Sequence, residues 1–217
     1  MNADFTTLCD EIAGMLRDLR RVIVALDGPD EAGIDRLADR LADHFDAVSV
    51  IRLRDFRLPD ADPDGSDVDF ARLTDEVADP LWRARTPAYH AASAEDAPPR
   101  IIACDPATTL YVVAGAFSHH PAVPDVYDLR VYVEPSADAP DTPPTDRRER
   151  IARYLSAYMV RQLSDLICAV GADDAYLPLP DEPRSPGVET VDMSALLPFD
   201  PKKSKTDQNP SKKSTET

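Results

Sequence analysis

The sequence predicts an α/β fold in which helices cover both faces of a parallel sheet. The first observation is a continuous apolar run at residues 22–26 (VIVAL), which is typical of a strand buried on both faces. The second is a helical period of apolar residues between Asp35 and Phe45, followed by another apolar run at 47–53 (AVSVIRL). A strand, a helix and a strand in this order indicate a parallel sheet with crossover helices.

The same two patterns predict the other elements. Before the first strand, apolar residues recur at three- and four-residue spacing, so residues 5–20 are expected to form an amphipathic helix. After the second strand, a polar loop at 57–67 precedes a helix from Phe70 to about Arg83, whose apolar face includes Trp82. Further strands are predicted at 100–104, 109–113 and 128–133, and a long helix at 145–170.

The composition changes near the end of the chain. A length of 217 residues fits one folded domain. Residues 178–201 contain six prolines, and residues 202–217 (KKSKTDQNPSKKSTET) are polar and hold every lysine of the sequence. Such segments cannot bury enough apolar surface to fold. We therefore predict one α/β domain over residues 1–180 and a Pro-rich, then Lys-rich, disordered tail over 181–217.

Charge and cysteine content exclude several classes of protein. A formal net charge of −16 disfavours binding to nucleic acid and to anionic membranes. No apolar run approaches the roughly 18 residues of a membrane span, and the first residues carry acids where a signal peptide carries cations. Cys9, Cys104 and Cys168 are odd in number and widely spaced, which predicts buried thiols, with no disulfide and no zinc site. We expect a cytoplasmic protein.

The turn after the first strand has the glycine spacing of a phosphate-binding loop. Gly28 and Gly33 match the pattern G-x-x-x-x-G of the Walker A motif. In such a loop, the next residue is a Lys that compensates phosphate charge, and the one after it is a Ser or Thr that holds Mg²⁺. Here Ile34 and Asp35 occupy those two positions. The spacing indicates the fold, whereas the substituted positions argue against the usual chemistry.

Residues 22–41 resemble the opening of the uridine kinase and phosphoribulokinase branch of P-loop kinases, and the resemblance extends over about residues 10–160. LRDFRLP is similar to that family's second-strand motif, which ends in Asp-Asp-Phe-Tyr. The family's substrate-side helix and its Tyr-Asp loop are similar to the stretch DVDFARLTDEVADPLWRARTPAYH. The family's Val-Val-Glu-Gly strand, with the strand after it, is similar to VVAGAFSHHPAVPDVYDLRVYVE. Its arginine-rich lid is similar to DRRERIARY. The resemblance implies a P-loop NTPase-like parallel sheet sandwiched by helices.

The resemblance implies a candidate site in which most catalytic positions are substituted. Arg54 stands where the family has its catalytic base, and Ala114 where it has a metal-facing Glu. Asp55 is retained and could act as a base only if the register slips by one residue. The positions implied as ligand contacts are Gly28, Gly33, Asp35, Arg147, Arg148 and Arg150 on the nucleotide side, and Tyr89 and His90 on the substrate side.

Electrostatics favours an inactive relative. Asp27, Asp30, Glu31 and Asp35 place four carboxylates within nine residues that contain no cation, so we expect weak or absent ATP turnover. The leading hypothesis is a degenerate uridine-kinase-like protein that binds a nucleotide-like ligand or a protein without phosphoryl transfer. One alternative is an active nucleoside or small-metabolite kinase that uses ATP, magnesium and Asp55. Another is a structural subunit that serves assembly.

Simpler interpretations exist for several of these residues. Acids such as Asp35 also favour a helix N-terminus, as an alternative to binding metal in an altered site. The lid arginines could clamp phosphate or could only form a charged helix start. Residues 60–65 imitate the opening of a calcium-binding loop, although a solvated acidic loop is favoured. A surface loop is favoured over a metal site for His119 and His120.

Overall fold

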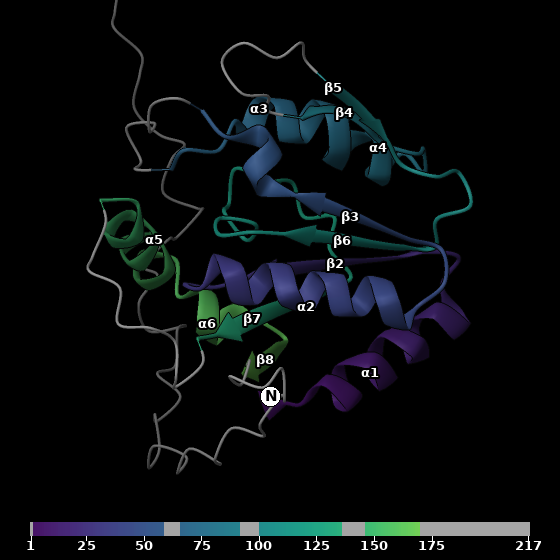
Figure 1. The fold of residues 1–217 in the computed structure, drawn as a ribbon, viewed down its shortest axis with the longest axis horizontal. Helices are drawn as coiled ribbons and strands as arrows, with labels where there is room; N and C mark the ends of the chain where they lie inside the picture. The colour runs from purple at the N-terminus through teal and green to yellow at the C-terminus, as the bar shows by residue number, and fades with distance from the viewer. Residues whose placement is uncertain (1, 59–65, 92–99, 136–145, 170–217) are drawn as a thin grey trace, which may run out of the picture. The chain divides into compact units, whose positions relative to one another are not determined.

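The computed structural model describes residues 2–58, 66–91, 100–135 and 146–169, all within the unit Met1–Asp181. Its main sheet has six strands in the order β1-β8-β7-β2-β6-β3, and all of its strand pairs are parallel (Figure 1). The strands are β1 (Asn2–Ala3), β2 (Val22–Asp27), β3 (Val48–Arg52), β6 (Leu110–Ala114), β7 (Leu129–Glu134) and β8 (Leu166–Ala169). The predicted α/β class with a parallel sheet is confirmed.

Strand β2 lies in the interior of the sheet between β7 and β6, and both of its faces are covered. All six of its residues are buried, as are all five of β6. Val24 is opposite Val112 of β6 on one side and Leu129 of β7 on the other. The continuous apolar runs of these strands are what a sheet with two covered faces requires.

Two layers of helix complete the fold. On one face, α1 (Phe5–Asp18) and α2 (Glu31–His44) bury Leu8, Ile12, Leu37 and other residues against Val24 and its neighbours. On the other face, Ile23 packs with residues of the second layer. This layer comprises α3 (Phe70–Leu73), the π-helical segment η2 (Thr74–Ala78), α4 (Asp79–Trp82), α5 (Asp146–Ala157) and α6 (Val160–Leu163). Adjacent residues of β2 therefore face opposite layers, as strand geometry requires.

The last predicted helix is wrong in its second half. Helix α5 ends at Ala157, and Met159 adopts a left-handed conformation (φ 47°) before the short α6. Residues 166–169 then form strand β8 beside β7, with all four residues buried. The helical spacing of the apolar residues concealed a short continuous apolar run that suits a buried parallel strand.

The other differences concern strand partners and a helix start. Residues 100–104 were predicted as a strand, and β5 (Arg100–Ala103) is one, but it pairs antiparallel with β4 (Ala88–Ala91) in a separate sheet. Helix α2 begins at Glu31, four residues before the predicted start, because the carboxylate-rich residues 31–35 belong to its first turns. Trp82 is 72% exposed, although packing was expected, since its neighbour Leu81 takes the inward position.

Some predictions fall on residues that are not described. These are the acidic segment 60–65 and the tail 181–217. The three cysteines are buried and free, as predicted. In the described ranges, no helix combines the length and the apolar character needed to cross a membrane.

Candidate functional site at the carboxyl edge of the sheet

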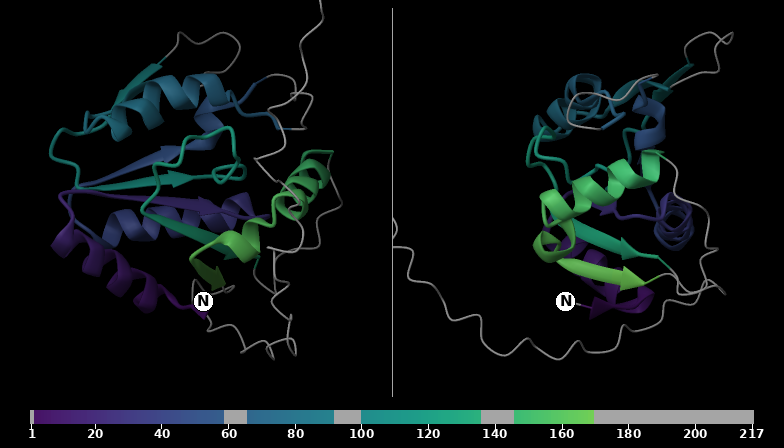
Figure 2. Two further views of the ribbon diagram at one scale, coloured as in Figure 1. Left: turned by 180° about the vertical axis from the view of Figure 1, so that it is seen from behind. Right: turned by 90° about the vertical axis from the view of Figure 1, so that its left-hand side faces the viewer.

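The candidate site lies at the carboxyl edge, the edge where the parallel strands end. Open α/β sheets bind ligands outside this edge because loops from several strands converge there. Strands β2, β3, β6 and β7 all point toward it, and both Figure 1 and the left view of Figure 2 place α5 at the same edge. The predicted phosphate loop, the segment around Asp55 and the lid arginines therefore meet in one region.

The turn after β2 is shorter than the Walker A spacing implies. Only Gly28, Pro29 and Asp30 separate β2 from α2. Gly28 is needed because an added Cβ would lie 2.2 Å from the Val133 carbonyl oxygen of the neighbouring strand. At Gly33, an added Cβ would lie 2.7 Å from Asp30 Oδ2. A carboxylate of the chain itself thus occupies the space that Gly33 leaves open over the first turn of α2.

Asp27, the last residue of β2, is a fully buried carboxylate. Its Oδ1 accepts hydrogen bonds from the backbone N–H groups of Gly28 (2.7 Å) and Phe117 (3.3 Å). Its Oδ2 accepts from the His119 N–H (2.9 Å) and the Tyr154 hydroxyl (2.7 Å). The loop after β6 therefore directs backbone donors at an internal carboxylate, in the manner of an anion-binding nest.

This loop packs inward, so the predicted surface position of the two histidines is wrong. His120 is buried and its ring stacks on Phe70, with centroids 4.4 Å apart. His119 is partly buried, with Nε2 3.4 Å from the Ala25 carbonyl oxygen. Burial lowers the pKa of His119, although the Asp27 carboxylate acts in the opposite direction. The polar loop sequence concealed the apolar and aromatic surroundings that these rings enter.

Glu31, at the start of α2, is held by two arginines from distant segments. Arg147 of α5 donates from Nε to Oε2 (3.0 Å) and from Nη2 to Oε1 (2.9 Å). Arg57 donates to the same Oε1 at 2.7 Å. Burial acts to raise the pKa of Glu31, but the two guanidinium groups outweigh it and lower the pKa. We call Arg57 and Arg147, closed on Glu31, the arginine clamp.

Asp35 is paired with two arginines, one from the end of β3 and one from the segment that follows it. Arg52 donates to Asp35, and Arg54 donates to its other oxygen at 2.5 Å. Arg52 also contacts Asp39 at 2.5 Å. Together with the arginine clamp, these pairs correct the expectation of uncompensated negative charge. The cations that pair with Glu31 and Asp35 come from β3, the segment after it and α5, and no local sequence pattern could show this.

The lid arginines separate into different environments. Arg147 also pairs with the buried Asp67, and Arg150 approaches the same carboxylate at 3.9 Å. Arg150 further pairs with Asp146 one helical turn earlier. Arg148, the third predicted lid residue, is exposed. Two of the three lid arginines, Arg147 and Arg150, therefore face the Asp67 carboxylate. The Oδ1 atom of Asp67 is buried and has no hydrogen-bond partner in the described part of the chain.

Asp55 and Tyr89 lie together, whereas His90 lies apart from them. Burial raises the pKa of the half-buried Asp55, against the nearby guanidinium groups and a hydrogen bond from Tyr89. Tyr89 is buried, which raises the pKa of its hydroxyl, and its ring packs on Phe56 with centroids 5.1 Å apart. His90 points the other way along β4, and its Nδ1 lies 3.1 Å from Glu76 Oε1.

These residues do not fit a magnesium triphosphate. Ile34, at the position of the phosphate-binding lysine, has no exposed surface and packs in the core beneath α2. Asp35, at the position of the magnesium-binding hydroxyl, is engaged by Arg52 and Arg54. Across the described ranges, no group of three or more His, Cys, Asp or Glu side chains is arranged to hold a metal ion.

Comparison with known proteins supports the fold alone. No model of a protein family matches this chain, and no curated protein matches it. Among solved structures, the chain is similar to a possible uridine kinase from Bacillus stearothermophilus. The TM-score is 0.54 at 15% sequence identity, over 74% of this chain and 98% of that chain. The chain therefore has an α/β fold like that of P-loop kinases.

Proposed function

We infer that this chain is a non-catalytic, uridine-kinase-like binding protein whose phosphate-binding edge is closed by its own carboxylates. The observation that supports this inference is the arginine clamp on Glu31. A two-point guanidinium–carboxylate pair uses the same donor geometry that recognises phosphate. While Arg147 and Arg57 hold Glu31, they are not available to a ligand. A nucleotide-like anion binds only by displacing Glu31 from the arginine clamp.

The surrounding residues favour the same conclusion. The Asp30 carboxylate lies over Gly33, and Asp27 takes the backbone donors of the loop after β6. Asp30 thus lies over the first turn of α2, where the exposed N–H groups of a helix would otherwise favour a phosphate. Like charges about 4 Å apart repel by up to a few kcal/mol near a protein surface. Catalysis of phosphoryl transfer depends on the opposite arrangement, with cations around the transferred group.

The test compares nucleotide binding by the wild type and Glu31→Gln. Calorimetric titration with Mg·ATP and Mg·ADP is expected to give weak binding to the wild type. Glu31→Gln removes the competing charge and should tighten binding about fivefold, the effect of one surface ion pair. Glu149→Gln is the matched control, because Glu149 is exposed on α5 and the charge change is the same.

Three outcomes separate the interpretations. Steady ATP consumption by the wild type with uridine or cytidine contradicts the proposal. Equal affinities of the Glu31→Gln and Glu149→Gln variants show that the clamp is not the barrier. Absence of heat with every variant at millimolar nucleotide removes the nucleotide-like ligand and favours a protein partner or an assembly role.

One observation favours the alternative of an active kinase. Asp55 is half-buried, its pKa is raised by burial, and Tyr89 donates a hydrogen bond to it. A carboxylate with a raised pKa is a suitable general base. Asp55→Asn would abolish any nucleoside-dependent ATP consumption under this alternative, and Asp75→Asn on η2 is its control.

A further inference from the structure

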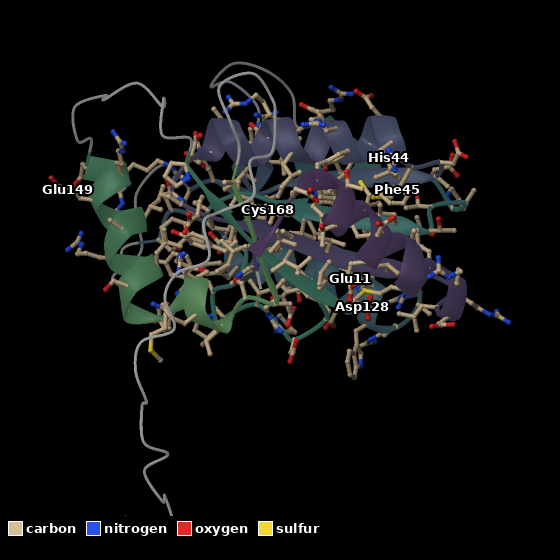
Figure 3. All side chains as sticks on the ribbon, turned by 90° about the horizontal axis from the view of Figure 1, so that it is seen from below. Glu11, His44, Phe45, Asp128, Glu149 and Cys168 are labelled. Carbon is tan, nitrogen blue, oxygen red and sulfur yellow. The ribbon has the colours of Figure 1, made fainter. Side chains whose placement is uncertain are left out.

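A second concave region lies at the amino edge of the sheet, opposite the carboxyl edge. The residues that line it come from the end of α1, the start of β2, the end of α4 and the loop before β7. Figure 1 shows α1 and α4 reaching the edge at which β2 begins, and Figure 3 labels Asp128 in this region. Its volume is about 420 Å³, within the range of small-molecule sites.

The floor of this pocket is apolar and its rim carries an exposed aromatic ring. Ile23, Leu81 and Val126 are buried beneath it, whereas Trp82 is 72% and Leu19 is 44% exposed. Within the described ranges, Trp82 makes no ring contact, and its indole N–H has no protein partner. The exposed indole at the rim is therefore available to a planar group of a ligand, and tryptophan is enriched at binding interfaces.

The charged side chains of the pocket differ in whether they already have partners. Arg21 donates to the Leu81 carbonyl oxygen, Asp128 accepts from the Ile23 N–H at 2.8 Å, and Asp125 pairs with Arg130 at 2.5 Å. Arg20, in contrast, makes no hydrogen bond or ion pair to any described residue. Arg20 is therefore the lining side chain whose donors are left for a ligand, and a guanidinium with unused donors favours an acidic group.

We propose that this pocket binds a small aromatic monocarboxylate, with its ring on the Trp82 indole and its carboxylate on Arg20. The apolar floor under Trp82 accepts the ring, and indole faces stack favourably on planar groups. The net charge of −16 disfavours polyanions, so a single negative charge suits the pocket better than a nucleotide does. This site is separate from the arginine clamp and does not depend on the function proposed for the carboxyl edge.

The sequence provides a direct reporter for the test. Trp82 is the chain's single tryptophan, so tryptophan fluorescence, excited selectively beyond the absorption of the tyrosines, reports on this pocket alone. Phenylacetate, the minimal probe of the class, should quench or shift the emission in a saturable manner at millimolar concentration or below. Phenylacetamide, which lacks the charge, and acetate, which lacks the ring, should each bind at least about fivefold more weakly.

Variants separate this site from adventitious binding. Arg20→Gln should weaken phenylacetate binding about fivefold, as expected for the loss of one exposed ion pair. Arg17→Gln is the matched control, because Arg17 is exposed on α1 and does not line the pocket. Trp82→Leu should abolish binding measured by saturation-transfer NMR on the ligand, with folding checked by circular dichroism. The proposal is overturned by no saturable response to phenylacetate, by equal binding of its amide, or by equal effects of the two arginine variants.

Discussion

The hydroxyl of Tyr154 gives a direct test of how the carboxyl edge is held together. It donates to Asp27 Oδ2 at 2.7 Å, and both side chains are buried. Burial, with the Asp27 carboxylate next in importance, raises the pKa of Tyr154. The phenol therefore keeps its proton, and remains a donor, throughout the pH range in which the protein is handled.

Tyr154→Phe removes this hydrogen bond while keeping the ring that packs on Phe117. Asp27 retains the N–H groups of Gly28, Phe117 and His119. The loss of a hydrogen bond to a buried charged group costs about 1.5–3 kcal/mol. For a domain of this size, that cost corresponds to a fall in melting temperature on the order of 5 °C.

The assay is urea unfolding followed by fluorescence and circular dichroism. Tyr158→Phe is the matched control, because the Tyr158 ring contacts that of Tyr154. Tyr158 is 41% exposed, and its hydroxyl bonds to no described residue. We expect the unfolding free energy of Tyr154→Phe to fall by about 1.5–3 kcal/mol and that of Tyr158→Phe by less than about 0.5 kcal/mol. If the two variants lose the same stability, Asp27 is not held by this contact, and the assigned hydrogen-bond network is wrong.

Three further predictions follow from the burial and charge of other residues. Because the pKa of Glu31 is lowered on folding, its stabilisation is present above the unfolded value near 4.3 and is lost as pH falls through the folded value. The difference in unfolding free energy between wild type and Glu31→Gln should therefore shrink in acid, and a pH-independent difference would contradict the clamp. Burial raises the pKa of Cys9 to about 11 and of Cys168 to about 12, so a thiol reagent at pH 8 should label them only after unfolding. Gly28→Ala should cost about 3 kcal/mol or more, because its Cβ would meet the Val133 carbonyl, and calorimetric melting close to wild type would refute the close approach.

The sheet could be predicted because its strands have a local signature. The apolar runs of β2 and β6 reflect burial on both faces, and the helical period after β2 reflects one apolar stripe on α2. Strand β8 was missed because its four buried residues continue the apolar spacing of the preceding helix. Its assignment as a strand comes from its pairing with β7, a contact that the sequence pattern does not encode.

The candidate site was less predictable because its contacts are distant in sequence. Glu31 and Arg147 are separated by 116 positions, and Asp27 and Tyr154 by 127. Four neighbouring carboxylates were visible in the sequence, but the arginines that pair with Glu31 and Asp35 were not. The absence of lysine before residue 200 gave a partial signal, since two-point pairing of carboxylates requires guanidinium groups.

Ile34 shows how a sequence motif and a structure can lead to opposite predictions. From the motif alone, Ile34→Lys combined with Asp35→Ser would restore a phosphate-binding loop and raise nucleotide affinity. In the structure, α2 already begins at Glu31, so Ile34 belongs to the helix and its side chain is completely buried in the core. An ammonium group at that position would lose its hydration without gaining a partner.

We therefore expect Ile34→Lys to lower the unfolding free energy by about 3 kcal/mol or more without tightening the binding of Mg·ATP. Ile34→Met, which keeps an apolar side chain of similar volume, should cost less than about 1.5 kcal/mol. Urea unfolding and calorimetric titration of the same samples measure both quantities. A folded Ile34→Lys variant that binds Mg·ATP more tightly than the wild type would show that the loop follows the Walker register, and that the early start of α2 is wrong.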